Sequence, residues 1–184
     1  MALSDSVRVL LISGSTRNGS ANTAALVTAA ALAPPRVTPV LYGGLTDLPA
    51  FNPDHDGALL PAAAAVLRGE IAAAAAVLFC TPEYAGTLPG SLKNLLDWTV
   101  GGGELSEKPV AWINVANQGR GGGATATLAS VLSYVAASVI AAACRDIPVP
   151  RDAVTPEGTV SDPRFTATVA DIWAAVLGQL DAAS

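Results

Sequence analysis

The chain has 184 residues, of which 51% are hydrophobic and 14% are charged. This composition excludes an intrinsically disordered protein and suits one domain with a sizeable core, which we expect to span residues 1–184. The formal net charge is −5, and the ten Lys and Arg residues are scattered along the sequence. A nucleic-acid partner is therefore disfavoured, because binding to its phosphates needs clustered positive charge.

The two cysteines, Cys80 and Cys144, lie in apolar stretches without the spacing of a zinc site or a disulfide framework. A reduced, cytoplasmic protein without a signal peptide is the simplest interpretation. An uncharged run of 24 residues between Arg120 and Arg145 is long enough to span a bilayer. Its opening glycines and its Ser and Thr residues favour a helix followed by a buried strand, so we expect no membrane partner.

The first half of the chain alternates predicted strands and helices. Residues 7–13 form a nearly continuous apolar run, which is typical of a strand that is buried on both faces of a parallel sheet. Ser20 is a candidate N-cap for a helix over residues 20–32. The pattern then predicts a strand at 37–41, a loop at 42–57, a helix at 59–70 and a strand at 76–80.

The second half continues the alternation. Residues 87–98 predict a helix with Thr87 as a candidate cap and with four leucines, at positions 88, 92, 95 and 96, on one face. Asp162 is a candidate cap for a last helix over residues 163–180. Between them we expect a turn at 101–108, a strand at 109–115, a glycine loop and helix at 121–134, and a fifth strand at 138–143.

Five strands that alternate with helices describe an α/β protein with a doubly wound parallel sheet and helices on both faces. In such sheets ligands bind beyond the carboxyl ends of the strands. The most informative motifs of this chain follow predicted strands at that edge.

The first motif is Gly-Ser-Thr-Arg-Asn-Gly-Ser-Ala-Asn at residues 14–22. It lacks the Lys of a Walker loop and the glycine spacing of a dinucleotide-binding loop. It offers hydroxyl groups, the Arg17 guanidinium, an amide and the N-terminus of a helix, which together suit a terminal phosphate. The alternative is a capped turn with a solvated Arg.

The second motif is Thr-Pro-Glu-Tyr-Ala-Gly-Thr-Leu-Pro-Gly-Ser-Leu-Lys-Asn-Leu-Leu-Asp-Trp at residues 81–98. Pro82 fixes the backbone, Gly86 allows a close approach, and Tyr84 can lie along a planar ligand. The alternative is an ordinary turn with an exposed Glu-Tyr pair. The two motifs together suggest a bound flavin mononucleotide (FMN).

Together the motifs resemble the NADPH-dependent FMN reductase family, which includes quinone, azo-dye and chromate reductases of flavodoxin-like fold. The signature Gly-Ser-x-Arg-x-x-Ser-x-Asn is met in full at residues 14–22. The signature Pro-Glu-Tyr-Asn-x-x-x-Pro-Gly-x-Leu-Lys-Asn-x-x-Asp-Trp is met at residues 82–98, except that Ala85 stands where the family usually has Asn. This departure removes a side-chain hydrogen bond near the flavin.

The resemblance implies a sheet with strand order 2-1-3-4-5 and an FMN site built from three loops. It implies that the FMN phosphate is held by Ser15, Arg17, Ser20 and Asn22. It implies that the isoalloxazine ring is lined by Pro82, Glu83, Tyr84, Ala85 and Gly86. The third loop, at residues 117–123, would border the pyrimidine end of the ring through Asn117, Gln118 and Gly119, although a flexible glycine turn explains this loop equally well.

The implied enzyme takes a hydride from NADPH or NADH and passes two electrons to a small molecule, such as a quinone, azo compound, metal oxyanion or free flavin, with ping-pong kinetics. The chemistry belongs to FMN, so no residue is assigned a catalytic role. Two rivals stay open: a flavodoxin-type electron carrier without nicotinamide activity, and a flavin-free interaction module. The resemblance also implies a homodimer or homotetramer, for which the surface around residues 92–98 is a candidate interface.

The sequence gives weaker support for other kinds of catalytic site. His55, the only histidine, stands between two aspartates, but this loop offers too few ligands for a metal, and we expect none. The sequence lacks the Gly-x-Ser-x-Gly motif that would make Ser15 a hydrolase nucleophile. Cys80 is expected to be a core residue, because cysteine is commonly buried and inert.

Overall fold

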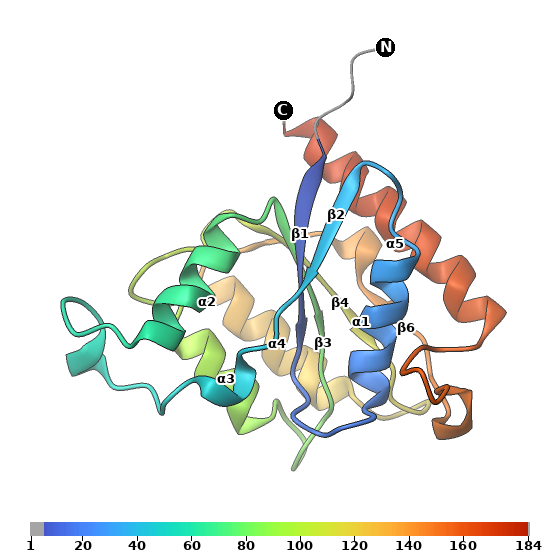
Figure 1. Ribbon diagram of the computed structural model, residues 1–184, viewed down its shortest axis with the longest axis horizontal. Helices are drawn as coiled ribbons and strands as arrows, with labels where there is room; N and C mark the ends of the chain where they lie inside the picture. Colours follow the sequence, from blue (N-terminus) through green and yellow to red (C-terminus); the bar gives the residue numbers. More distant parts are fainter. Residues whose placement is uncertain (1–5, 184) are drawn as a thin grey trace.

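The computed structural model describes residues 6–183 and has a parallel β-sheet at its centre (Figure 1). The strand order is β2-β1-β3-β4-β5, which confirms the predicted order and the flavodoxin-like architecture, and β6 also pairs with β4. All the pairings are parallel. The strands are β1 (Val7–Ser13), β2 (Val37–Leu41), β3 (Ala76–Cys80), β4 (Pro109–Asn114), β5 (Ser138–Val139) and β6 (Arg145–Asp146).

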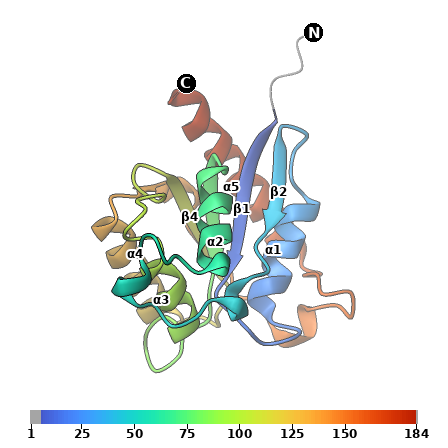
Figure 2. The same ribbon diagram turned by 60° about the vertical axis from the view of Figure 1, so that its left-hand side comes forward.

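Helices cover both faces of the sheet, as predicted. Figures 1 and 2 show α1 and α5 on one face and α2, α3 and α4 on the other. Side chains along β1 alternate between the two faces of the sheet and so contribute to the core on each face. Val9 and Leu11 pack under α1 and α5, whereas Leu10 and Ile12 pack under the other three helices. The helices are α1 (Ala21–Ala31), α2 (Ala62–Ala72), α3 (Gly90–Asp97), α4 (Gly122–Tyr134) and α5 (Pro163–Ala182).

Two predicted helix caps are confirmed. The Ser20 side chain accepts a hydrogen bond from the backbone N–H of Asn22 at the start of α1. Asp162 accepts from the backbone N–H of Arg164 at the start of α5. Each cap satisfies one of the N–H groups that a helix leaves without an internal partner, which is why these helices begin where the sequence indicates.

The predicted fifth strand over residues 138–143 is wrong in its extent. Only Ser138–Val139 pairs with the start of β4. The chain then leaves the sheet in a 3-10 turn at Ala141–Ala143 and returns as β6, which pairs with the end of β4. Alanine favours strands only weakly, so the Ala-rich segment forms a turn instead of continuing the ladder.

Two predicted helix starts are also wrong. The helix expected from residue 87 begins at Gly90, and Thr87 belongs to a preceding turn in which its backbone exchanges hydrogen bonds with that of Tyr84. The helix expected from residue 59 begins at Ala62. Pro61 explains the second shift, because the residue that precedes a proline is sterically pushed out of the helical region.

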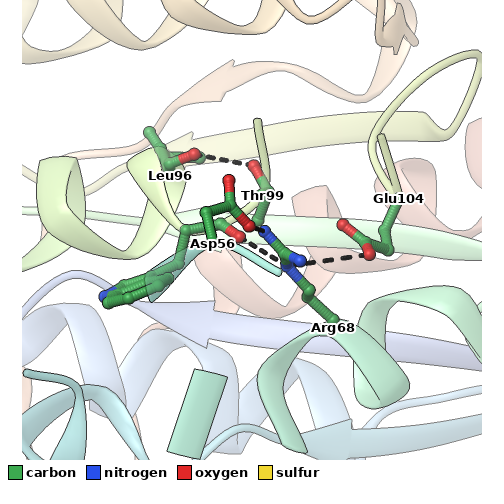
Figure 3. A network of polar contacts seen from close by, with 6 residues as sticks. Asp56, Arg68, Leu96, Thr99 and Glu104 are labelled. Atoms are coloured by element: carbon green, nitrogen blue, oxygen red, sulfur yellow. Dashed lines mark hydrogen bonds and ion pairs between the residues drawn. The ribbon is translucent and has the colours of Figure 1, made fainter. Parts of the chain in front are cut away.

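The residue-42–57 loop is held to the body of the protein by a network centred on Arg68 of α2 (Figure 3). The Arg68 guanidinium pairs with Asp56 of this loop and lies 3.8 Å from a carboxylate oxygen of Glu104. Its Nε donates to the backbone carbonyl of Trp98 at 2.7 Å. One cation thus joins two loops and the end of α3.

The second half of the residue-81–98 motif also contributes to this attachment. The Asn94 side chain accepts a hydrogen bond from the Phe51 backbone N–H and donates to the carbonyl of Pro49. The Trp98 indole N–H donates to the same carbonyl at 2.8 Å, and its ring meets that of Phe51 edge to face. These motif residues therefore hold the residue-42–57 loop against the end of α3.

The apolar side chains of α3 form core contacts. Leu92, Leu95 and Trp98 are fully buried within one chain, so they cannot supply the contacts of an interface over residues 92–98.

Within residues 6–183, no helix combines the length and the apolar character needed to cross a bilayer. The uncharged run after Arg120 forms α4 and β5.

Candidate functional site

Three loops meet at the carboxyl edge of the sheet, which is the lower edge in Figure 1. They follow β1, β3 and β4, which are neighbours in the sheet. Adjacent strands lie about 4.8 Å apart, so the first and third loops start about 10 Å from each other. The sheet thus brings the three predicted motif loops to one edge, where parallel sheets bind ligands.

The loop over residues 14–20 presents unused backbone donors. In the part of the chain that the structure describes, the N–H groups of Asn18, Gly19 and Ser20 have no protein acceptor. Arg17 is exposed, and its guanidinium makes a single 3.4 Å contact with the carbonyl of Gly19. Free N–H groups beside a helix N-terminus and a guanidinium make a cradle for an anion.

Gly14 lets this loop pack against the next one. A Cβ at this position would lie 2.2 Å from the hydroxyl oxygen of Thr81 and 2.9 Å from a methyl group of Leu92. The Gly14 backbone N–H donates to the carbonyl of Cys80 at the end of β3. Only a residue without a side chain fits this crossing of two loops.

Asn22 connects the first loop to β3. Its side-chain oxygen accepts from the Cys80 thiol at 3.4 Å, and its amide nitrogen donates to Ser20 at 3.4 Å. Complete burial raises the pKa of the Cys80 thiol well above its usual range. Cys80 is therefore a protonated, buried thiol, which agrees with the predicted core role and does not suit redox chemistry.

The loop after β3 ends in a tight turn over residues 84–87. The backbones of Tyr84 and Thr87 exchange two hydrogen bonds, of 3.0 and 3.1 Å. The two central residues, Ala85 and Gly86, both have positive φ, at 51° and 76°. This is the geometry of a type I′ turn, for which Asn-Gly is the preferred sequence. The Asn that the family usually has at position 85 thus suits the backbone, and Ala85 is strained there.

The Glu83 side chain ties the second loop to the third. One of its carboxylate oxygens accepts from the backbone N–H groups of Gly123, at 2.7 Å, and of Ala124, at 3.2 Å. These are first-turn N–H groups of α4, so Glu83 caps that helix from another part of the chain. A Cβ on Gly123 would lie 2.0 Å from the carbonyl oxygen of Gly86, so the two loops are in direct contact.

The third loop is organised by Asn114, a buried residue at the end of β4. Its amide nitrogen donates to Asp146 of β6 at 2.7 Å and to the carbonyl of Arg120 at 3.2 Å. Its oxygen accepts from the Ala116 backbone N–H. The tip between these anchors, at residues 117–120, is exposed.

A cavity of about 570 Å³ lies between the three loops. This volume falls within the range of about 300–1,000 Å³ that is typical of small-molecule sites. Five predicted site residues line it: Arg17, Asn22, Pro82, Glu83 and Asn117. The Arg17 guanidinium in this cavity fits an anionic ligand, and the volume fits a flavin nucleotide.

The other predicted site residues lie around this cavity. Ser15 and Ser20 line an adjoining cavity of about 390 Å³, which also contains Arg17. Gln118 and Gly119 line a depression of about 560 Å³ on the side of α4. Tyr84, Ala85 and Gly86 line none of the three and form an exposed turn at the rim.

Residues 7–145 match the family described as NADPH-dependent FMN reductase. The chain belongs to the NADPH-dependent FMN reductase family. Membership makes the protein a flavin-dependent oxidoreductase that uses FMN and NAD(P)H. The three-loop cavity at the carboxyl edge of the sheet is the candidate site for that cofactor, because parallel sheets bind ligands there.

Several known proteins are similar to this FMN reductase family member. An NAD(P)H-dependent FMN reductase of Pseudomonas aeruginosa is 42% identical over 126 residues, which cover 67% of each chain. A quinone reductase of Escherichia coli K12 is 31% identical over 59% of this chain and 57% of its own length. The structure of FerB, a flavoenzyme NAD(P)H:(acceptor) oxidoreductase of Paracoccus denitrificans, has a TM-score of 0.78 with 26% identity and covers 96% of this chain and 98% of its own.

Sequence reasoning missed parts of this candidate site. The loop after β6 supplies Val149, Pro150 and Arg151 to the cavity, and Arg120 lines it from the third loop. The capping role of Glu83 and the anchoring role of Asn114 were also missed. A polar residue that ends an apolar strand was the available signal for Asn114. No local pattern distinguishes Arg151, because its place in the site depends on the course of the chain after β6.

The structure also shows which potential metal ligands lie near one another. Among residues 6–183, no His, Cys, Asp and Glu side chains gather in the groups of three or more that a metal site needs. His55 lies in a short 3-10 turn at Pro53–His55, in the loop that Arg68 anchors through Asp56.

Proposed function

We propose that the protein is an NAD(P)H-dependent reductase of small molecules, and that the three-loop cavity binds FMN. The observation that carries the proposal is the meeting of three loops at one edge of the sheet through two glycine-permitted contacts. Arginine side chains line the three-loop cavity, and the free N–H groups of residues 18–20 belong to the adjoining cavity that shares Arg17 with it. A bound FMN would supply the redox chemistry, which is the uptake of a hydride from the nicotinamide donor and the transfer of two electrons to the acceptor.

The residues of the chain bind and orient in this proposal. Ser15, Ser20 and Arg17, with the free N–H groups of their loop, would hold the phosphate. The N–H groups of Ala85 and Gly86, which have no protein acceptor among residues 6–183, are available to the polar edge of the ring. Glu83 fixes the distance between the second and third loops through its bonds to α4.

We propose that donor and acceptor use the same open face in turn, which gives ping-pong kinetics. The turn with Tyr84, whose exposed fraction is 54%, does not line the cavity and so does not cover it. A quinone, azo compound, metal oxyanion or free flavin is the acceptor class, in line with the names of the quinone and azo reductases to which the chain is similar.

Initial-rate kinetics test this proposal. The FMN-loaded protein is supplied with NADPH or NADH and with 1,4-benzoquinone at several fixed concentrations. Double-reciprocal plots with parallel lines are expected, because the oxidised donor leaves before the acceptor binds. Intersecting lines would contradict the shared face. Oxidation of neither donor, together with flavin reduction in two separated one-electron steps, would favour the electron-carrier alternative.

We further propose a cytoplasmic homodimer or homotetramer. Both cysteines are free thiols in the structure, which suits a reducing compartment. An interface would use surface outside the buried leucines of α3. Light scattering at micromolar concentration is expected to give at least twice the mass of 18.4 kDa, and a monomer would refute the assembly.

A further inference from the structure

The cavity concentrates cations that have no acidic partner. Arg17, Arg120 and Arg151 come from three different loops and line the same cavity. Within residues 6–183, no carboxylate pairs with any of them. The one acidic residue that lines the cavity is Glu83, and one of its oxygens is already engaged by two N–H groups of α4.

Each of the remaining cations of the chain has at least one acceptor in the protein, and most of them pair with a carboxylate. Of the ten Lys and Arg residues, seven lie outside the cavity. Five of them pair with a carboxylate and two donate to a backbone carbonyl. They are Arg8, Arg36, Arg68, Lys93, Arg164, Arg145 and Lys108. Among residues 6–183, four arginines have no carboxylate partner, and three of them line this cavity; the fourth is Arg145.

Three like charges around one cavity repel one another and attract an anion. The guanidinium is planar, and it binds the oxygens of a phosphate with two parallel hydrogen bonds. Arg17 belongs to the loop already proposed for the FMN phosphate. Arg120 and Arg151 lie outside both sequence motifs, on the loops that follow β4 and β6.

We propose that Arg151 and Arg120 form a second phosphate-binding subsite of the cavity. The ligand chemistry is a phosphate monoester, which carries a charge of about −2 near pH 7. This inference rests on the proposed function, because FMN and NADPH are the two phosphate monoesters that such an enzyme brings to the cavity. The ester is either the 5′-phosphate of FMN, which the subsite would share with Arg17, or the 2′-phosphate of NADPH.

The test compares Arg151→Gln and Arg120→Gln with Arg36→Gln in the full chain. Arg36→Gln is a matched control because it removes the same charge far from the cavity. Arg36 lies just before β2, at the opposite edge of the sheet, where it pairs with the exposed Asp181. Arg151→Lys keeps the charge without the planar fork. In the first arm, flavin fluorescence quenching gives the Kd of FMN and of riboflavin, which lacks the phosphate. In the second arm, KM is measured for NADPH and for NADH.

Two ratios are compared: the Kd of FMN over that of riboflavin, and the KM of NADPH over that of NADH. Loss of one charge-assisted contact is expected to change one of these ratios about tenfold. If FMN affinity falls and riboflavin affinity does not, the subsite binds the FMN phosphate. If KM rises for NADPH and not for NADH, it binds the 2′-phosphate. If both ratios equal those of Arg36→Gln, the inference is overturned. An FMN-loaded wild type that oxidises neither donor would refute the proposed function instead, and the Kd values of FMN against riboflavin and of NADPH against NADH would then decide the inference.

Discussion

The strained turn at Ala85 yields the sharpest prediction. Ala85 has a φ of 51° at the first central position of the type I′ turn, where Asn or Gly is favoured. The substitutions Ala85→Asn and Ala85→Gly keep the turn and remove the strain. Because the turn lies at the rim of the cavity and its N–H groups are free, a more ordered turn is also expected to bind FMN more tightly.

The expected gain in the free energy of unfolding follows from the backbone conformation of residue 85 alone. A left-handed conformation costs an ordinary residue about 1–2 kcal/mol. Glycine avoids this cost but loses about 0.5–1 kcal/mol through its more flexible unfolded chain. The net gain expected for Ala85→Gly is therefore about 0.5–1 kcal/mol, and Ala85→Asn should gain a similar amount because Asn is several-fold enriched in this region. For a chain of this size the melting temperature should rise by about 2 °C.

Ala136 supplies a matched control away from the cavity. It has a φ of 55° and follows the end of α4, where its backbone N–H donates to Ser133 and that of Ala137 donates to Leu132. These bonds define a Schellman motif, which usually has glycine at this position. Ala136→Gly should therefore give a similar rise in melting temperature without any change in FMN affinity.

Thermal melts of the apo proteins and FMN titrations check both substitutions. The reasoning fails if Ala136→Gly stabilises the protein and Ala85→Gly and Ala85→Asn do not. An unchanged FMN affinity in stabilised Ala85 variants would refute the link between the turn and the flavin, and would leave the strain argument intact.

Three further predictions follow from single contacts. Glu83→Ala should lower the free energy of unfolding by about 1–2 kcal/mol in urea titrations and weaken FMN binding, whereas Glu83→Gln keeps an acceptor for α4 and should lose less. Arg68→Met leaves two largely buried carboxylates without their cation and should cost about 2–3 kcal/mol, less than a fully buried pair; an unchanged urea midpoint would contradict the network. Arg36 lowers the pKa of Asp181 by hydrogen bonding and charge, so the pair stabilises the fold above the unfolded pKa and the effect is lost as pH falls through the folded pKa. The melting temperatures of wild type and Asp181→Asn should therefore differ at pH 7 and converge in acid.

The fold was predictable where the sequence carries continuous apolar runs. The strands over residues 7–13 and 76–80 were predicted with their observed bounds, because both faces of a parallel strand are buried. The strand order came from the family resemblance and not from composition. The fifth strand was not predictable, because the three alanines at 141–143 do not distinguish a ladder from a turn, and the pairing with β4 decides between them.

The meeting of the three loops at one edge of the sheet was predictable, whereas the contacts between them were not, and the binding role of their residues stays a prediction. The cap at Ser20 is local, and its motif identified it. The contact of Glu83 with α4 joins residues 40 positions apart and depends on how closely two loops pack. The place of Arg151 depends on the path of the chain after β6. Local patterns describe a residue's own loop, whereas these roles arise from the crossing of loops.

The absorption spectrum of the purified protein tests the central claim most directly. It is recorded before and after incubation with excess FMN and desalting, and again after anaerobic addition of NADPH. The account predicts retained flavin bands that bleach on addition of NADPH or NADH. Protein that stays colourless after FMN incubation, or flavin bands that neither donor bleaches, would contradict it.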